Sequence, residues 1–201
     1  MGAPLVAFSC RARTILGVSA ALPFVIEVAH LAREWDQAPP DGDVVEARAP
    51  GWLVDAISMG GIAVGLLSVW PVRARPVRTP RACFAAGITA IWGGMALRQW
   101  AHATLGRFHR GEVTIHADHE LVTAGPYAHV RHPLYAASIG VFSGIGMGLG
   151  TKVSVAASTA LPMAAHVYRI QVEERAIASS PLGPAYAVYA EGRKRLIPGI
   201  W

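Results

Sequence analysis

The stretch PLYAASIGVFSGIGMGLG, residues 133–150, decides the fold of this chain. It contains no charged side chain, begins with a proline and ends with a glycine. Proline suits the first turn of a helix, and glycine commonly follows the last turn. Because a helix needs about 20 mostly apolar residues to cross a bilayer, we predict a membrane-spanning helix over residues 134–150.

Four further apolar stretches accompany it in a chain of 201 residues that is 53% hydrophobic and only 15% charged. A soluble domain normally carries about 25% charged residues. We therefore predict an all-α fold, an integral membrane helical bundle of about five transmembrane helices in a single domain over residues 1–201. The other four spans are expected at residues 14–31, 51–70, 82–100 and 153–172.

The segment ERAIASSPLGPAYAVYAEGRKRLIP, residues 174–198, is polar but patterned. It predicts a helix, a break at the proline and glycine, and a short amphipathic C-terminal helix that lies on the cytoplasmic surface.

Glycines recur at intervals of four within the apolar stretches, at Gly61 and Gly65 and again at Gly140, Gly144 and Gly148. Glycine lets two helices approach closely in lipid, so these positions predict helix packing. The run GIGMGLG, residues 144–150, also resembles a nucleotide-binding loop. Such a loop needs a preceding strand and a following helix, and this context is absent.

Five spans place the N-terminus, the loop 71–81 and residue 152 on one side, with seven Lys and Arg against eleven on the other side. The positive-inside rule then puts the loop 101–133 and the C-terminus in the cytoplasm, although four arginines in the loop 71–81 oppose this orientation. The arginine-rich composition suggests a bacterial plasma membrane. The net charge of +5 has no aromatic-interleaved basic patch beside it, so we predict no nucleic-acid partner.

A polar segment, GPYAHVRHPLYAA at residues 125–137, precedes the fourth predicted span. Pro133 disfavours a helical conformation at His132 and suits the first turn of the helix that follows. Arg131 and His132 therefore lie at the helix N-terminus beside free backbone N–H groups, where a carboxylate or a ribose oxygen can bind. The alternative interpretation is an interfacial anchor made of Arg, Tyr and Pro side chains.

Arg169 and Glu173 come at the end of the fifth predicted span and share one helix face, so they can pair. A simple ion pair at the membrane boundary is the alternative to a functional role. Six of the eight histidines lie between residues 102 and 132. A metal site needs three or four converging ligands, and the sequence offers only the pair His116 and His119, so we expect no metal.

Two blocks of sequence resemble the signature of the isoprenylcysteine carboxyl methyltransferases and their bacterial relatives. The first is HELVTAGPYAHVRHPLY, residues 119–135. The second comprises RIQVEERAI at 169–177, LGPAYAVY at 182–189 and RLIP at 195–198. The resemblance covers residues 98–198, the cofactor-binding catalytic half, whereas residues 1–97 are generic spans. Leu182 stands where the family usually has Phe, and one extra residue lies between Glu173 and Gly183.

The resemblance implies methyl transfer from S-adenosylmethionine, yielding S-adenosylhomocysteine, without a Rossmann domain. His119, Leu121 and Val122 would line the adenosine pocket, and Glu173 would contact the cofactor from the other side. Arg169 would meet the acceptor, with His132 and Arg131 as further catalytic or supporting residues. The full cofactor-binding set that the resemblance implies is His119, Leu121, Val122, Gly125, Tyr127, His132, Pro133, Tyr135, Glu173 and Glu174.

The acceptor that the resemblance implies is hydrophobic, either an isoprenylcysteine-like carboxylate or another lipidated or lipid-like molecule. A carboxylate needs no base, and Arg169 would orient it by a charged hydrogen bond. A phenol, thiol or amine would need a base such as His132. The alternative function is a non-catalytic multi-pass membrane protein, in transport or assembly, that keeps the fold.

Overall fold

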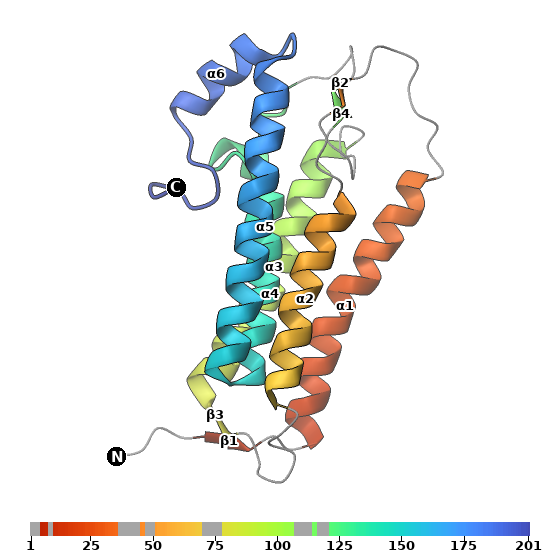
Figure 1. Ribbon diagram of the computed structural model, residues 1–201, viewed down its shortest axis with the longest axis vertical. Coiled ribbons are helices and arrows are strands. Elements are labelled where there is room, and N and C mark those ends of the chain that lie inside the picture. Colours follow the sequence, from red (N-terminus) through yellow and green to blue (C-terminus); the bar gives the residue numbers. More distant parts are fainter. Residues whose placement is uncertain are drawn as a thin grey trace.

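The computed structural model describes residues 5–7, 10–35, 45–46, 51–69, 78–106, 114–115 and 121–201. Five long helices run side by side, and a short sixth helix lies across one end of the bundle (Figure 1). The helices are α1 (Cys10–Trp35), α2 (Gly51–Val69), α3 (Arg81–Leu105), α4 (Pro133–Leu149), α5 (Lys152–Ala178) and α6 (Gly183–Glu191).

Short strands make only two small pairs in the described ranges. Strand β1 (Leu5–Ala7) pairs antiparallel with β3 (Arg78–Pro80), and β2 (Val45–Glu46) pairs antiparallel with β4 (Thr114–Ile115). Figure 1 places β1 and β3 at one end of the bundle, with β2, β4 and α6 at the other. A 3₁₀ turn, η3 (Gly125–Ala128), precedes α4. The described residues 121–132 and the C-terminal segment, residues 192–201, therefore lie at the same end of the bundle, as the predicted order of helices requires.

The prediction of an all-α fold is confirmed, and each of the five apolar stretches forms a helix. Helix α5 extends furthest past a predicted end, because it continues through Ala178 and so includes Glu173 and Glu174. Its last turns, EERAIA, consist mostly of good helix formers, and Pro181 follows shortly after them. Within the described ranges, no helix combines the length and hydropathy that crossing a membrane requires. The number of spans stays a prediction.

Close helix packing occurs at the glycines of α4, which confirms the interpretation of GIGMGLG as packing rather than a phosphate loop. A Cβ atom at Gly144 would lie 2.5 Å from the Gly87 carbonyl oxygen of α3. One at Gly146 would lie 2.6 Å from the Ser154 carbonyl oxygen of α5. Gly150, with φ 80°, ends α4 in the left-handed conformation. These contacts hold α4 between α3 and α5 and so fix where its N-terminus lies.

Two apolar clusters form the core of the described structure. The larger one joins α1, α3 and α4 through Leu16, Ile91, Met95, Val141, Ile145 and Leu149. The smaller one joins Ile139 of α4, Ile170 of α5 and Leu196 of the C-terminal segment. The second cluster packs that segment against the polar end of α4 and α5, where the candidate site lies.

Candidate active site

The N-terminus of α4 is bound to the C-terminal segment. Pro133 is fully buried as the first residue of the helix, and His132 caps it with φ −126° and ψ 63°. The backbone N–H groups of Arg131 and His132 donate to the carbonyl oxygens of Lys194 and Arg195, both at 2.9 Å. The N–H groups of Arg131 and His132 themselves are therefore bound by the C-terminal segment, and a ligand at the N–H groups of the first turn of α4 stays a prediction.

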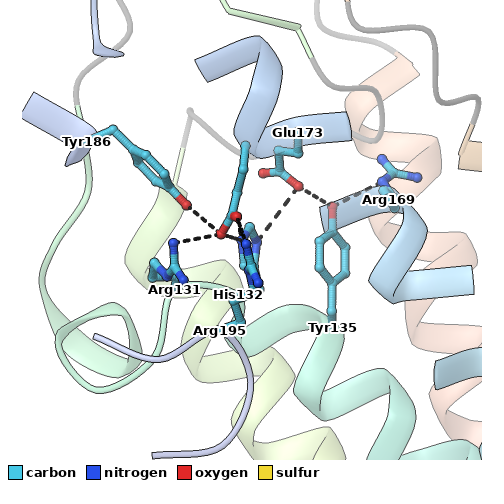
Figure 2. Close-up of polar contacts among 8 residues, drawn as sticks. Arg131, His132, Tyr135, Arg169, Glu173, Tyr186 and Arg195 are labelled. Atoms are coloured by element: carbon cyan, nitrogen blue, oxygen red, sulfur yellow. Dashed lines mark hydrogen bonds and ion pairs between the residues drawn. The ribbon is translucent and has the colours of Figure 1, made fainter. Parts of the chain in front are cut away.

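Glu174 lies at the centre of a group of side chains that we call the Glu174 cluster: Arg131, His132, Glu174, Tyr186 and Arg195. Its Oε1 atom is 2.8 Å from Arg131 Nη1 and 3.2 Å from His132 Nε2. Tyr186 donates to the same oxygen at 3.1 Å, and Arg195 donates to Oε2 at 3.0 and 2.7 Å. The side chains around Glu174 of α5 come from the residues just before α4, from α6 and from the C-terminal segment (Figure 2).

The Glu174 cluster lowers the pKa of the Glu174 carboxyl group. Burial alone would raise the pKa of its carboxyl group, but hydrogen bonds from His132 and Arg195 and the charge of Arg131 lower it to about 2. The carboxylate is therefore ionised at neutral pH, and its oxygens are bound by protein donors. Through these contacts Glu174 links the end of α5 to the start of α4, to α6 and to the C-terminal segment.

Glu173, the preceding residue, makes different contacts. Tyr135 donates its hydroxyl to Glu173 Oε2 at 2.7 Å, and Arg169 Nε donates to the Tyr135 oxygen at 3.0 Å (Figure 2). We call Arg169, Tyr135 and Glu173 the Glu173 chain. His132 Nδ1 lies 3.9 Å from the same carboxylate oxygen. The Glu173 side chain is 26% exposed against 12% for Glu174, so its carboxylate keeps room for further donors.

The ring of Tyr135 stacks on the rings of two histidines. The Tyr135 ring lies 5.5 Å from the ring of His132 and 5.1 Å from that of His166, with interplanar angles of 13° and 17°. The Arg169 guanidinium lies 5.8 Å from the centre of the Tyr135 ring. Tyr135 is therefore fixed between two histidines, with its hydroxyl held by Arg169 and Glu173.

Tyr127 reaches the site from η3. Tyr189 of α6 donates its hydroxyl to the Tyr127 carbonyl oxygen at 2.7 Å, which fixes the turn against the tail. Burial, and next the negative charge of Glu173, raise the pKa of the Tyr127 hydroxyl, so this group lies within electrostatic range of the Glu173 chain. The hydroxyl oxygen is buried, and no residue in the described ranges bonds to it. Within the described ranges, Tyr127 therefore offers an unused donor on which the charge of the Glu173 carboxylate acts.

A family model described as "Isoprenylcysteine carboxyl methyltransferase (ICMT) family" matches residues 87–179. Through this segment, which makes up a little under half of the chain, the chain is similar to the isoprenylcysteine carboxyl methyltransferase family. Its fold is also similar to the solved structure of the eukaryotic intramembrane Ras methyltransferase ICMT, with a TM-score of 0.59 and 23% identity. The match covers 76% of this chain and 54% of that structure, so the chain spans about half its length. No curated protein matches this sequence.

The structure brings together most of the residues that the family resemblance implies: Tyr127, Arg131, His132, Tyr135, Arg169, Glu173 and Glu174. Gly125, with φ 56°, lies where a Cβ would meet Thr104 of α3, so it serves the turn itself. Leu121 and Val122 are half-buried before η3. His119 lies outside the described residues, as do His109 and His116. The roles of all these residues stay predictions.

The sequence interpretation missed four residues of the site. Tyr186 and Arg195 belong to the second family block, but no role was assigned to them, and the structure places both on Glu174. His166 lies three residues before Arg169, and this helical spacing could have indicated that it faces the site. Arg98 of α3, with Nη1 2.8 Å from Ser138 Oγ, binds the first turns of α4 from the other side.

Proposed function

We propose that this chain is a membrane methyltransferase that moves a methyl group from S-adenosylmethionine to the carboxylate of a hydrophobic, isoprenylcysteine-like acceptor. One observation carries the proposal. The residues of the Glu173 chain contact one another although they come from two separate blocks of family sequence, and the charge of Glu173 acts on the Tyr127 hydroxyl, which has no hydrogen-bond partner in the described ranges. Residues 87–179, which match the family model, include every member of that group.

The residues present fit the cofactor. A buried hydroxyl that has no partner among the described residues, and a partly exposed carboxylate, suit the ribose hydroxyls and the ammonium group of S-adenosylmethionine. Tyr127 and Glu173 would hold these polar groups, and Leu121 and Val122 would contact the adenine. When bound, the cofactor supplies an electrophilic methyl group on a positively charged sulfur. Glu174 is a poor candidate for direct binding because its oxygens already accept from Arg131, His132, Tyr186 and Arg195.

A carboxylate acceptor suits the remaining side chains best. The ring nitrogens of His132 face Glu173 and Glu174, at 3.9 and 3.2 Å, so this residue is engaged and is a poor base for a phenol, thiol or amine. A carboxylate loses no proton when it is methylated. Arg169 can orient it through a charge-assisted hydrogen bond, and the rate would come from positioning and from exclusion of water.

Apolar side chains on the outside of the helices support a location in the membrane. Val18 of α1, Leu67 of α2, Trp92 of α3 and Val153 of α5 are each about half exposed or more. Isolated exposed apolar residues are ordinary on soluble proteins, but such residues on successive helices favour contact with lipid. We propose a bacterial plasma membrane, with the end of the bundle that carries α6 in the cytoplasm.

Two measurements on detergent-purified protein test the proposal. Titration calorimetry with S-adenosylhomocysteine should show binding, and Tyr127→Phe should weaken it. Labelled S-adenosylmethionine should transfer its methyl group to N-acetyl-S-farnesylcysteine, with base-labile label as expected of a methyl ester. Tyr168→Phe, an exposed tyrosine on α5, is the matched control. Absence of binding by the wild type at millimolar S-adenosylhomocysteine would instead favour a non-catalytic membrane protein.

A further inference from the structure

His166 of α5 is a buried polar residue that the reaction described above does not use. Its side chain is 5% exposed, and within the described ranges neither ring nitrogen has a hydrogen-bond partner. A buried polar group without a partner is costly, and native structures rarely keep one without a reason. A leucine would fill the same space without that cost. The imidazole therefore calls for a partner that the described part of the chain does not supply.

The position of His166 relates it to the acceptor end of the site. His166, Arg169 and Glu173 are spaced by three and four residues, which puts them on one face of α5. His166 stacks on Tyr135 at 5.1 Å, and the guanidinium of Arg169 lies 5.8 Å from the same ring. His132 stacks on Tyr135 too, but its ring nitrogens face carboxylates. Of the two histidines on Tyr135, His166 is thus the one that can bind a ligand.

The surroundings of His166 change from polar to apolar along α5. Arg169 and Glu173 lie toward the tail, whereas Met163, three residues before His166, packs on the cluster of Ile139 and Ile170. A molecule lying along this face would meet charged donors at one end and hydrocarbon at the other. An isoprenylcysteine-like acceptor has this order of groups, a carboxylate followed by a long apolar chain.

We propose that His166 binds the methyl acceptor: its ring N–H donates to the acceptor carboxylate, which Arg169 binds from the next turn of the helix. The inference rests on the proposed function and adds to it a residue that selects the acceptor. A neutral imidazole has one N–H donor, so it can bind a carboxylate oxygen without taking a proton. The second carboxylate oxygen stays free to attack the methyl group.

Three substitutions separate a binding role from a packing role. His166→Leu removes both nitrogens, whereas His166→Asn and His166→Gln place an amide near the positions of Nδ1 and Nε2. The readouts are KM and kcat with N-acetyl-S-farnesylcysteine, Kd for S-adenosylhomocysteine, and the melting temperature. His166→Leu should raise KM for the acceptor by about tenfold, the usual effect of losing one such hydrogen bond. Kd for S-adenosylhomocysteine should stay within about twofold, and Asn or Gln should restore most of the loss.

The following outcomes would overturn the inference that His166 binds the acceptor. An unchanged KM in His166→Leu would show that the ring does not bind the acceptor. A parallel loss of cofactor affinity and melting temperature, or a lack of rescue by both amides, would show a packing role. If His166→Leu does not fold, the two amide variants decide alone. A raised KM together with a lowered melting temperature in both His166→Asn and His166→Gln would show a packing role. A wild type that binds S-adenosylhomocysteine but leaves this carboxylate unmethylated also overturns it, whereas a wild type without any binding refutes the proposed function itself.

Discussion

Glu173 and Glu174 are adjacent carboxylates on one helix, yet the structure uses them in opposite ways. Glu174 is enclosed by donors from three other segments, and its charge closes the C-terminal segment over the start of α4. Glu173 accepts from Tyr135 and keeps a quarter of its side chain exposed. From this difference we propose that the two acidic residues divide between stability, at Glu174, and ligand binding, at Glu173.

The largest expected effect comes from Glu174→Ala, because this change leaves Arg131, Arg195 and His132 without their shared carboxylate. Removing one member of a buried ionic group typically costs about 3 kcal/mol or more of stability. Thermal unfolding in detergent should show a large fall in melting temperature, and limited proteolysis should cut the C-terminal segment. An equal fall in Glu173→Ala would remove the distinction between the two carboxylates.

Glu173→Gln should weaken cofactor binding rather than lower stability. We expect the affinity for S-adenosylhomocysteine to fall by about tenfold to a hundredfold, the usual worth of a hydrogen bond to a charged group, with little change in melting temperature. Calorimetry measures the affinity. Glu191→Gln, an exposed glutamate at the end of α6, is the matched control. Unchanged affinity in Glu173→Gln would place the cofactor elsewhere.

Acid should act on the Glu174 cluster in a defined pH range. The pKa of Glu174 is about 2 in the folded chain against an ordinary value of 4.5, so the folded state binds this proton more weakly than the unfolded state does. The resulting stabilisation is complete above pH 4.5 and is lost as the pH falls toward 2. Melting temperatures at pH 6, 4 and 3 should show this slope in the wild type. The same slope in Glu174→Gln would assign it to another group.

The smallest expected effect is that of Tyr186→Phe. This change removes one hydrogen bond to Glu174 while the two arginines and His132 remain. We expect a loss of about 1 kcal/mol of stability and unchanged cofactor binding. Tyr135→Phe is the comparison, because it breaks the Glu173 chain and should lower methyl transfer far more than stability. Similar losses of activity in both variants would contradict the division between cluster and chain.

Much of the fold could be predicted from local signals. Long apolar runs with Pro133 at a start and Gly150 at an end predict helices, and the spacing of Gly140, Gly144 and Gly148 predicts close packing. The different roles of Glu173 and Glu174 could not be predicted, because adjacent residues point about 100° apart on a helix and the rotation of α5 depends on tertiary packing. The bonds from Arg131 and His132 to the tail depend on a register between segments about 60 residues apart, which local patterns do not encode.

The engaged carbonyl group of Trp201 has a practical consequence for purification. It accepts the N–H groups of Leu196 and Ile197 at 2.8 and 2.9 Å, and the guanidinium of Arg195 lies 5.4 Å from the indole ring. An affinity tag fused directly after this residue would disturb these contacts and, with them, the C-terminal segment that packs over the start of α4. A tag placed before β1, a strand that Figure 1 shows at the other end of the bundle, would leave the C-terminal segment undisturbed.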